Sequence, residues 1–178
     1  MFDYEFKEIN TEDLQQDLLN KFNRYQTVKR SWVNVNGKWQ LIENSFNYDW
    51  DIERKRRTVK ELAEIKQSGG VIYGVFDNSD IIAFSSVGPD FSEDYMAGYI
   101  PIGFIHVSYE YRNKGIGKKL FAMMTEKAKH FEAKKIYICI MPAEESYAFY
   151  KNIGCTDAVV IHKPSAEYDY SRQMEFVL

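Results

Sequence analysis

The sequence has few of the features that mark disulfide-bonded, metal-binding or membrane-spanning proteins. Only two cysteines occur in 178 residues, Cys139 and Cys155, and neither belongs to a CxxC pair or a Cys/His cluster. No run approaches the roughly 18 apolar residues of a membrane helix. The first residues, MFDYEFKEINTEDL, lack the basic and apolar regions of a secretory signal. We therefore expect a cytoplasmic protein with no metal site and no membrane partner, in which both cysteines are packing residues.

An excess of positive charge is also missing. The chain has 23 Lys and Arg against 26 Asp and Glu, which gives a formal net charge of -3 at pH 7. Proteins that bind nucleic acid usually carry a basic field over one face. The balance therefore predicts no nucleic-acid partner and favours a small or cationic one.

Apolar and aromatic residues are abundant, at 45% and 16% of the chain. This is enough to bury one core, with rings lining it and any cleft. Internal repeats, low-complexity segments and Gly- or Pro-rich linkers are absent from the sequence. We therefore expect one domain over residues 1–178, as a monomer or as a homodimer that uses the apolar C-terminal strand.

The spacing of apolar residues predicts a mixed α/β domain. Helices are expected over 11–22, 50–67, 116–131 and 144–152, and a loop or short hairpin around Asn36-Gly37 within 29–44. The strand, helix, strand unit over 99–141 predicts a right-handed crossover with two parallel strands. Strands are expected at 2–9, 71–77, 81–88, 99–110, 136–141, 157–161 and 172–178.

One short motif, RNKGIGKKL at residues 112–120, places two glycines and several cations between an extended run and a helix. The first N–H groups of a helix have no intrahelical acceptor, and the helix dipole adds positive potential there. Gly115 and Gly117 would let an anion approach the backbone closely, and a diphosphate is a natural guest. The alternative is a tight turn that only starts the helix, with its lysines solvated.

Together with the segment SYAFYKNIGC at residues 146–155, this motif resembles the GNAT superfamily of N-acetyltransferases. Residues 112–117 match its acetyl-coenzyme A signature, Q/R-x-x-G-x-G/A, and residues 146–155 match most of a second signature, A-x-x-F-Y-x-x-x-G-F. The resemblance implies a central, mostly antiparallel sheet with one splayed parallel pair of strands, flanked by helices. It covers nearly the whole chain, and residues 28–44 fit least well. The matching residues are Arg112, Gly115, Gly117, Phe149, Tyr150 and Gly154.

The sequence departs from the family pattern at four places. Tyr109 stands where proline is common, Asn113 where a second glycine often follows the arginine, and Cys155 where an aromatic residue is usual. None of these removes a phosphate donor. Ala143 takes the place of an asparagine that many members carry near the cofactor thiol, so that contact is not transferred.

The resemblance implies acetyl-coenzyme A as acetyl donor. Backbone amides of the turn would hold the pyrophosphate, and main-chain groups of the preceding strand would align the pantetheine arm. The thioester would lie in a slot between 99–107 and 135–141. The cofactor-binding residues implied in this way are Phe104, Ile105, His106, Val107, Arg112, Asn113, Lys114, Gly115, Ile116, Gly117 and Lys118.

The chemistry implied is direct attack of a neutral amine on the thioester, with a base to remove a proton and an acid to protonate the thiolate. Tyr150 matches the family's recurrent acid position, although it could merely pack on the core. His106 has a suitable pKa range for the base. Alternation along its strand could instead turn it to the opposite face of the sheet as a structural residue.

Candidate substrate contacts are Tyr48, Trp50 and Asp51 in NYDWD, a combination of rings and carboxylates that suits an organic cation. Asp51 or its neighbour Asp49 could equally cap a helix. Asp90 belongs to an acidic loop that could attract a cationic amine or simply be solvated. We expect an N-acetyltransferase for a small primary amine; a protein or peptide acetyltransferase and a non-catalytic acyl-coenzyme A binding domain are the alternatives.

Overall fold

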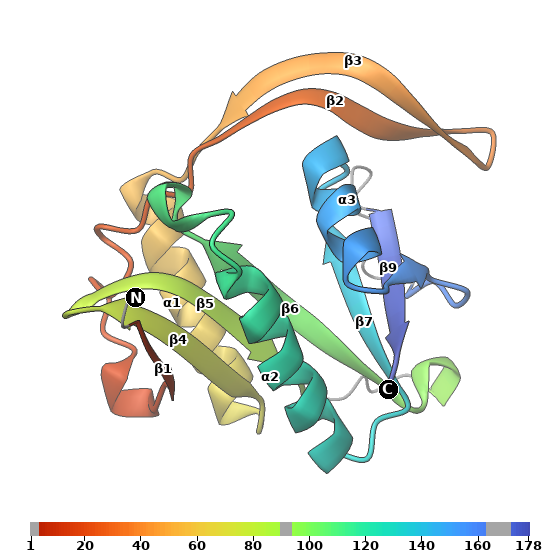
Figure 1. The fold of residues 1–178 in the computed structure, drawn as a ribbon. Helices are drawn as coiled ribbons and strands as arrows, with labels where there is room; N and C mark the ends of the chain where they lie inside the picture. Colours follow the sequence, from red (N-terminus) through yellow and green to blue (C-terminus); the bar gives the residue numbers. More distant parts are fainter. Residues whose placement is uncertain (1–3, 90–93, 163–171) are drawn as a thin grey trace.

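A computed structural model describes residues 4–89, 94–162 and 172–178. Within these residues a seven-stranded sheet forms the centre, in the order β1-β4-β5-β6-β7-β9-β8, with helices on both faces (Figure 1). The expected mixed sheet with one parallel pair is confirmed. The sheet strands are β1 (Glu5–Glu8), β4 (Val71–Asp77), β5 (Asp80–Val87), β6 (Tyr99–Val107), β7 (Lys135–Ile140), β8 (Thr156–Asp157) and β9 (Arg172–Val177).

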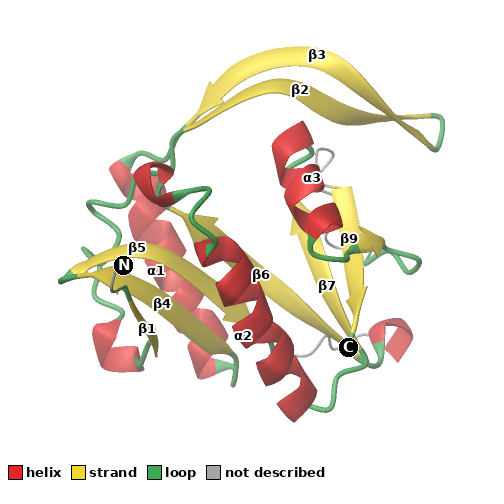
Figure 2. Cartoon of the chain, in the orientation of Figure 1, coloured by secondary structure: helices red, strands yellow, loops and turns green. Residues whose placement is uncertain are grey.

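Helix α1 (Ile52–Gln67) covers one face of the sheet, and α2 (Ile116–His130) and α3 (Glu144–Asn152) cover the other (Figure 2). Each helix buries one apolar stripe, as amphipathic spacing requires. Leu62 of α1 packs in one cluster with Phe104 at its edge, whereas Leu120 of α2 packs in another with Ile105 at its edge. Successive side chains of β6 therefore face opposite helices, as expected for a strand with period two.

The parallel pair β6–β7 is held together at only one end. Tyr99 to Ile102 pair with Lys135 to Ile138, and beyond Ile102 the two strands diverge (Figure 1). On the other side of β6 the register with β5 shifts between Ser86 and Val87, which leaves Gly103 as an extra residue. Such a bulge bends its strand. The bend turns the second half of β6 away from β7 and opens the sheet.

Gly103 is suited to this bulge because there is little room for a side chain. A Cβ at this position would lie 3.0 Å from Ser86 Oγ and 3.2 Å from Ile65 Cδ1. The Ser86 hydroxyl in turn accepts a hydrogen bond from the backbone N–H of Phe104, at 3.1 Å. Close approach at Gly103 and this hydrogen bond together fix the point at which the sheet opens.

A second, two-stranded sheet lies outside the main one. Strands β2 (Gln26–Val35) and β3 (Lys38–Tyr48) form a long hairpin that arches over α3 and the end of β7 (Figure 1). Asn36 and Gly37 make its turn with φ of 51° and 81°, as two-residue turns of this kind require. The hairpin expected here is confirmed, but it is far longer than predicted and runs through residues 26–48.

Two predicted elements differ in the structure. The helix expected over 11–22 is wrong: a 3-10 turn, η1 (Thr11–Asp13), is followed by hydrogen-bonded turns. The carboxylate of Asp13 accepts from the backbone N–H of Asn10 at 3.0 Å and so caps the start of this turn, but the chain does not continue as a helix beyond Asp13. The strand expected over 157–161 is limited to Thr156–Asp157. Among the described residues, no helix is long and apolar enough to cross a membrane.

Candidate active site

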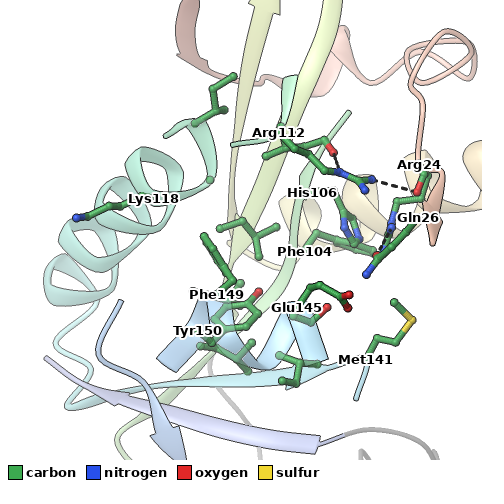
Figure 3. A pocket seen from close by; sticks show the side chains of 18 of the residues that line it. Arg24, Gln26, Phe104, His106, Arg112, Lys118, Met141, Glu145, Phe149 and Tyr150 are labelled. Carbon is green, nitrogen blue, oxygen red and sulfur yellow. Dashed lines mark hydrogen bonds between the residues drawn. The ribbon is translucent and has the colours of Figure 1, made fainter. Parts of the chain in front are cut away.

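The opening between β6 and β7 contains a cavity of about 940 Å³ (Figure 3). Its walls come from β6 and the turn after it, from the end of β7, from α3 and from the start of the hairpin. The site is thus assembled where the sheet is split, from segments distant in the sequence. The lining side chains that bear on its chemistry are Arg24, Gln26, Phe104, His106, Val107, Arg112, Lys118, Cys139, Met141, Glu145, Phe149 and Tyr150.

One end of the cavity is formed by backbone. Asn113 and Gly115 have φ of 62° and 80°, and Gly115 is the N-cap of α2. This conformation exposes the first N–H groups of the helix, which have no intrahelical acceptors. A Cβ at Gly117 would lie 3.3 Å from Phe149 Cζ and 3.7 Å from Val107 Cγ2, so a side chain there would fill the cradle. The turn therefore fits a diphosphate, as the motif predicts.

The cationic side chains of the motif point to different places. Lys118 lines the cavity, whereas Lys119 lies over the ring of Phe6, 3.6 Å from its centroid. The guanidinium of Arg112 donates from Nε to the carbonyl of Val107 at 3.0 Å and from a terminal nitrogen to the carbonyl of Arg24 at 3.2 Å. Arg112 therefore ties the end of β6 to the start of the hairpin, which leaves backbone N–H groups and Lys118 as the donors that a diphosphate would meet.

The middle of the cavity runs between two strand edges. Phe104 to Val107 form one wall and Cys139 to Met141 the other. These stretches of β6 and β7 do not pair with each other, which leaves main-chain groups along the slot for an extended ligand. The predicted pantetheine-binding segment thus lines the cavity. Cys139 is exposed in this wall, which corrects its assignment as a packing residue, whereas Cys155 is buried.

Tyr150 lies on α3 and points its hydroxyl into the cavity (Figure 3). Its ring also packs on the core, with centroids 5.0 Å from Phe149 and 6.5 Å from Phe121. Burial raises the pKa of the Tyr150 phenol, and the neighbouring Cys155 thiol raises it further. The phenol therefore stays protonated at neutral pH and can donate a proton or a hydrogen bond. Its role as acid stays a prediction.

His106 lies on the α1 face of β6 and also lines the cavity, so the two placements considered for it are compatible. Its ring centroid is 5.0 Å from that of Trp50. Burial lowers the pKa of His106 well below its usual value, and the guanidinium groups of Arg24, Arg112 and Arg54 lower it further. The imidazole is therefore neutral at physiological pH and binds a proton weakly. His106 is therefore a poorer candidate for the base than a histidine of ordinary pKa, and its role as base stays a prediction.

Three of the four predicted substrate residues, Tyr48, Trp50 and Asp51, do not line the cavity. Trp50 is buried in the core beside α1, and Tyr48 is exposed at the end of β3. The carboxylate of Asp51 accepts from the backbone N–H of Arg54 at 2.7 Å, so Asp51 caps α1, the alternative considered for it. Asp90 lies outside the described residues. The cationic-acceptor hypothesis therefore gains no support from Tyr48, Trp50 or Asp51 in this structure.

Sequence reasoning did not single out three polar residues of the lining: Arg24, Gln26 and Glu145. Arg24 is only 8% exposed and donates from Nη1 to Gln26 Oε1 at 2.9 Å. Glu145 is exposed on the first turn of α3. No local pattern marks these residues, because only the path of the hairpin brings Arg24 and Gln26 to the split in the sheet.

Solved structures with this fold include several acetyltransferases. A protein described as a streptothricin acetyltransferase from Bacillus anthracis str. Ames, in complex with acetyl coenzyme A, is 17% identical with a TM-score of 0.71, and the match covers 99% of each chain. Nourseothricin acetyltransferase is 14% identical with a TM-score of 0.71 over 98% of each chain. The ribosomal-protein-alanine N-acetyltransferase from Brucella melitensis is 14% identical with a TM-score of 0.57, over 98% of this chain and 99% of its own.

No curated protein matches the sequence significantly. The structural likenesses, all below 25% identity, show a shared fold. Residues 37–155 match the acetyltransferase (GNAT) family, and this range includes the glycine turn, both walls of the slot and Tyr150. Most of the chain is thus matched by the family that the two signatures predicted, and the protein belongs to the GNAT acetyltransferases.

Proposed function

We propose that this protein transfers the acetyl group of acetyl-coenzyme A to the primary amine of a small molecule by direct attack. The donor supplies an activated thioester carbonyl, which an unprotonated amine can attack. The turn over residues 112–118 would hold the pyrophosphate, and the edge of β6 would align the pantetheine arm. The reacting carbon would then lie near the divergence of β6 and β7, between Tyr150 and His106.

Tyr150 is the candidate acid for the departing thiolate. Its hydroxyl points into the cavity and its raised pKa keeps it protonated. For the proton released by the amine, the lining offers Glu145 and His106, directly or through water. The lowered pKa of His106 makes this imidazole a weaker proton acceptor than an ordinary histidine.

One observation carries the choice of a small acceptor: the hairpin begins in the lining of the cavity, at Gln26 and Thr27, and its strand β2 spans the opening from the end of β6 to the segment after β7. Strand β2 is hydrogen-bonded to the segment that follows β7, where the backbone N–H of Trp32 donates to the Pro142 carbonyl at 2.7 Å. Arg30 and Glu144 add a bidentate ion pair, with Nε to Oε2 at 2.8 Å. A protein or peptide substrate would need an open groove where this hairpin lies.

The measurement is release of free thiol from acetyl-coenzyme A in the presence of polyamines, amino acids, aminoglycosides, peptides and folded proteins. We expect at least one class of small amine to accelerate release. Acceleration by peptides or proteins alone would replace the proposal with its protein-directed alternative. Thermal stabilisation by acetyl-coenzyme A with no acceleration by any amine would favour a non-catalytic binding domain instead.

A further inference from the structure

Arg24 is a buried cation without a counter-ion. It is 8% exposed, yet it forms no ion pair with any described residue. Of its guanidinium nitrogens only Nη1 has a hydrogen-bond partner among these residues, the Oε1 of Gln26, and Nε is buried without one. Buried arginines in proteins are almost always paired with an anion. The guanidinium carbon also lies 5.3 Å and 5.8 Å from the ring centroids of Tyr48 and Trp50, contacts that do not neutralise its charge. The missing counter-ion of Arg24 is therefore expected to be a ligand.

The groups around Arg24 act on its pKa in both directions. Burial, followed by the charge of Arg112, lowers the pKa of Arg24 to about 10, so it remains charged at neutral pH. Asp49 acts in the opposite direction but more weakly than Arg112. A third guanidinium, that of Arg54, pairs with Glu61 at 2.9 Å. Arg24 itself, with its Nε buried and unpaired, thus carries a charge that a bound anion would neutralise.

Arg24 lies near Tyr150 and His106 at the reacting end of the cavity, and its carbonyl contacts the turn through the side chain of Arg112. Its charge lowers the pKa of Tyr150 and of His106, the two groups placed beside the thioester. Figure 3 shows Arg24 and Gln26 on the opposite side of the cavity from Lys118 and the start of α2. The diphosphate would be held at that other end. The anion that we expect to pair with Arg24 is therefore part of the acceptor substrate.

We infer that the acceptor amine carries a carboxylate, which is bound by the Arg24 guanidinium and by the side-chain amide of Gln26. This inference rests on the proposed acetyl transfer to a small amine and names its substrate class as amino acids or closely similar amino carboxylates. A guanidinium offers a planar set of donors that fits a carboxylate. Because Gln26 Oε1 already accepts from Arg24, its amide NH₂ is left to donate to the same carboxylate.

The test compares each of several α-amino acids with its primary amide and with the amine that lacks the carboxyl group. Wild-type protein is expected to use the acids with the highest kcat/KM. Arg24→Met should lower kcat/KM for the acids about 30-fold or more, because the buried carboxylate of the substrate loses its charged partner. The kcat/KM for the amides should stay nearly unchanged. Arg24→Lys should retain part of the preference. Lys29→Met, which removes an exposed cation from the same hairpin, should change neither.

A binding measurement separates this inference from the proposed function. With coenzyme A bound, N-acetylated amino acids should raise the Tm of wild-type protein more than their amides do, and Arg24→Met should abolish the difference. If this preference is present but no amine is acetylated, the proposed function fails and the carboxylate site stands. Equal use of acids and amides by wild type, equal losses for both in Arg24→Met, or no extra stabilisation by the acids would overturn the inference.

Discussion

The two ends of the cavity are built in different ways. The proposed phosphate end is made of consecutive residues, 112–118, whose backbone would supply the donors. The acceptor end is made of side chains from separate elements: Arg24 and Gln26 at the start of the hairpin, His106 on β6 and Glu145 on α3. A backbone cradle requires glycine and a helix start but almost no particular side chain. A side-chain site can change its specificity by single substitutions while the cradle stays intact.

The same contrast explains why likeness in fold says little about the acceptor. Structures described as streptothricin, nourseothricin and ribosomal-protein-alanine acetyltransferases share this architecture with the chain at 14–17% identity. A common cofactor end is compatible with many acceptor ends, because function is set by site residues rather than by the fold. If this division holds, a change at one end of the cavity should alter the use of one of the two substrates and leave the other nearly unaffected.

The largest effect should come from Tyr150→Phe, which removes only the hydroxyl. We expect turnover to fall about 100-fold or more if the phenol is the acid, because positioned acid–base groups contribute on that scale. The affinity for acetyl-coenzyme A should change little. The readout is kcat from thiol release together with calorimetric titration of coenzyme A. Tyr147→Phe on the same helix serves as control, and equal turnover in both variants would remove the assignment.

A second change addresses the phosphate end alone. Gly115→Val and Gly37→Val place a β-branched residue at φ of 80° and 81°, in both cases with open space around the new Cβ. Backbone strain should therefore destabilise both proteins similarly. Only Gly115→Val should weaken coenzyme A binding, by about 10- to 100-fold, the equivalent of one lost hydrogen bond to a charged group. Unaltered binding by Gly115→Val would contradict the cradle.

At the acceptor end, His106 should make the stability of the protein depend on pH. The pKa of His106 is depressed in the folded protein, so below pH 6.5 the unfolded chain binds a proton that the folded chain does not. As the pH is lowered from 6.5 to the folded pKa, the free energy of unfolding should therefore decrease, by at most about 1.4 kcal/mol per pH unit. His106→Gln should lose this part of the slope in thermal unfolding between pH 7.5 and 5. His130→Gln, which alters an exposed histidine, should keep it.

The smallest effect concerns the fastening of the hairpin. Arg30→Gln removes the ion pair with Glu144, whose side chains are 44% and 33% exposed. Such pairs contribute about 0.2–1 kcal/mol, so Tm should fall only slightly. The KM for the acceptor should rise several-fold more than that for acetyl-coenzyme A, because the hairpin begins in the lining at the acceptor end of the cavity. A larger effect on acetyl-coenzyme A than on the acceptor would break the proposed division.

The phosphate end could be predicted from the sequence because its determinants are local. Glycines at 115 and 117 followed by an amphipathic run specify turn and helix without help from distant residues. The split in the sheet was expected only through the family resemblance, since the bulge at Gly103 depends on Ser86 and Ile65. Residues 26–48 mix polar and apolar residues without a clean period, so the long hairpin escaped detection.

The acceptor end could not be predicted for the same physical reason. Arg24 reaches the cavity because the preceding turns pack Leu19 and Phe22 on the core and because Arg112 binds its carbonyl. Nothing near Arg24 in the sequence signals either contact. In contrast, NYDWD looks like a binding motif in isolation, yet Trp50 completes a core and Asp51 starts a helix.

The bulge at Gly103 also bears on solubility. By ending the pairing of β6 with β7 it creates two strand edges inside the sheet, at residues 103–107 and 139–140. Unpaired edges are templates for association with other chains. The hairpin and α3 cover part of this opening, and a pantetheine arm lying along the slot would occupy more of it. We therefore expect the cell's supply of acetyl-coenzyme A to limit self-association of this protein as well as to feed its reaction.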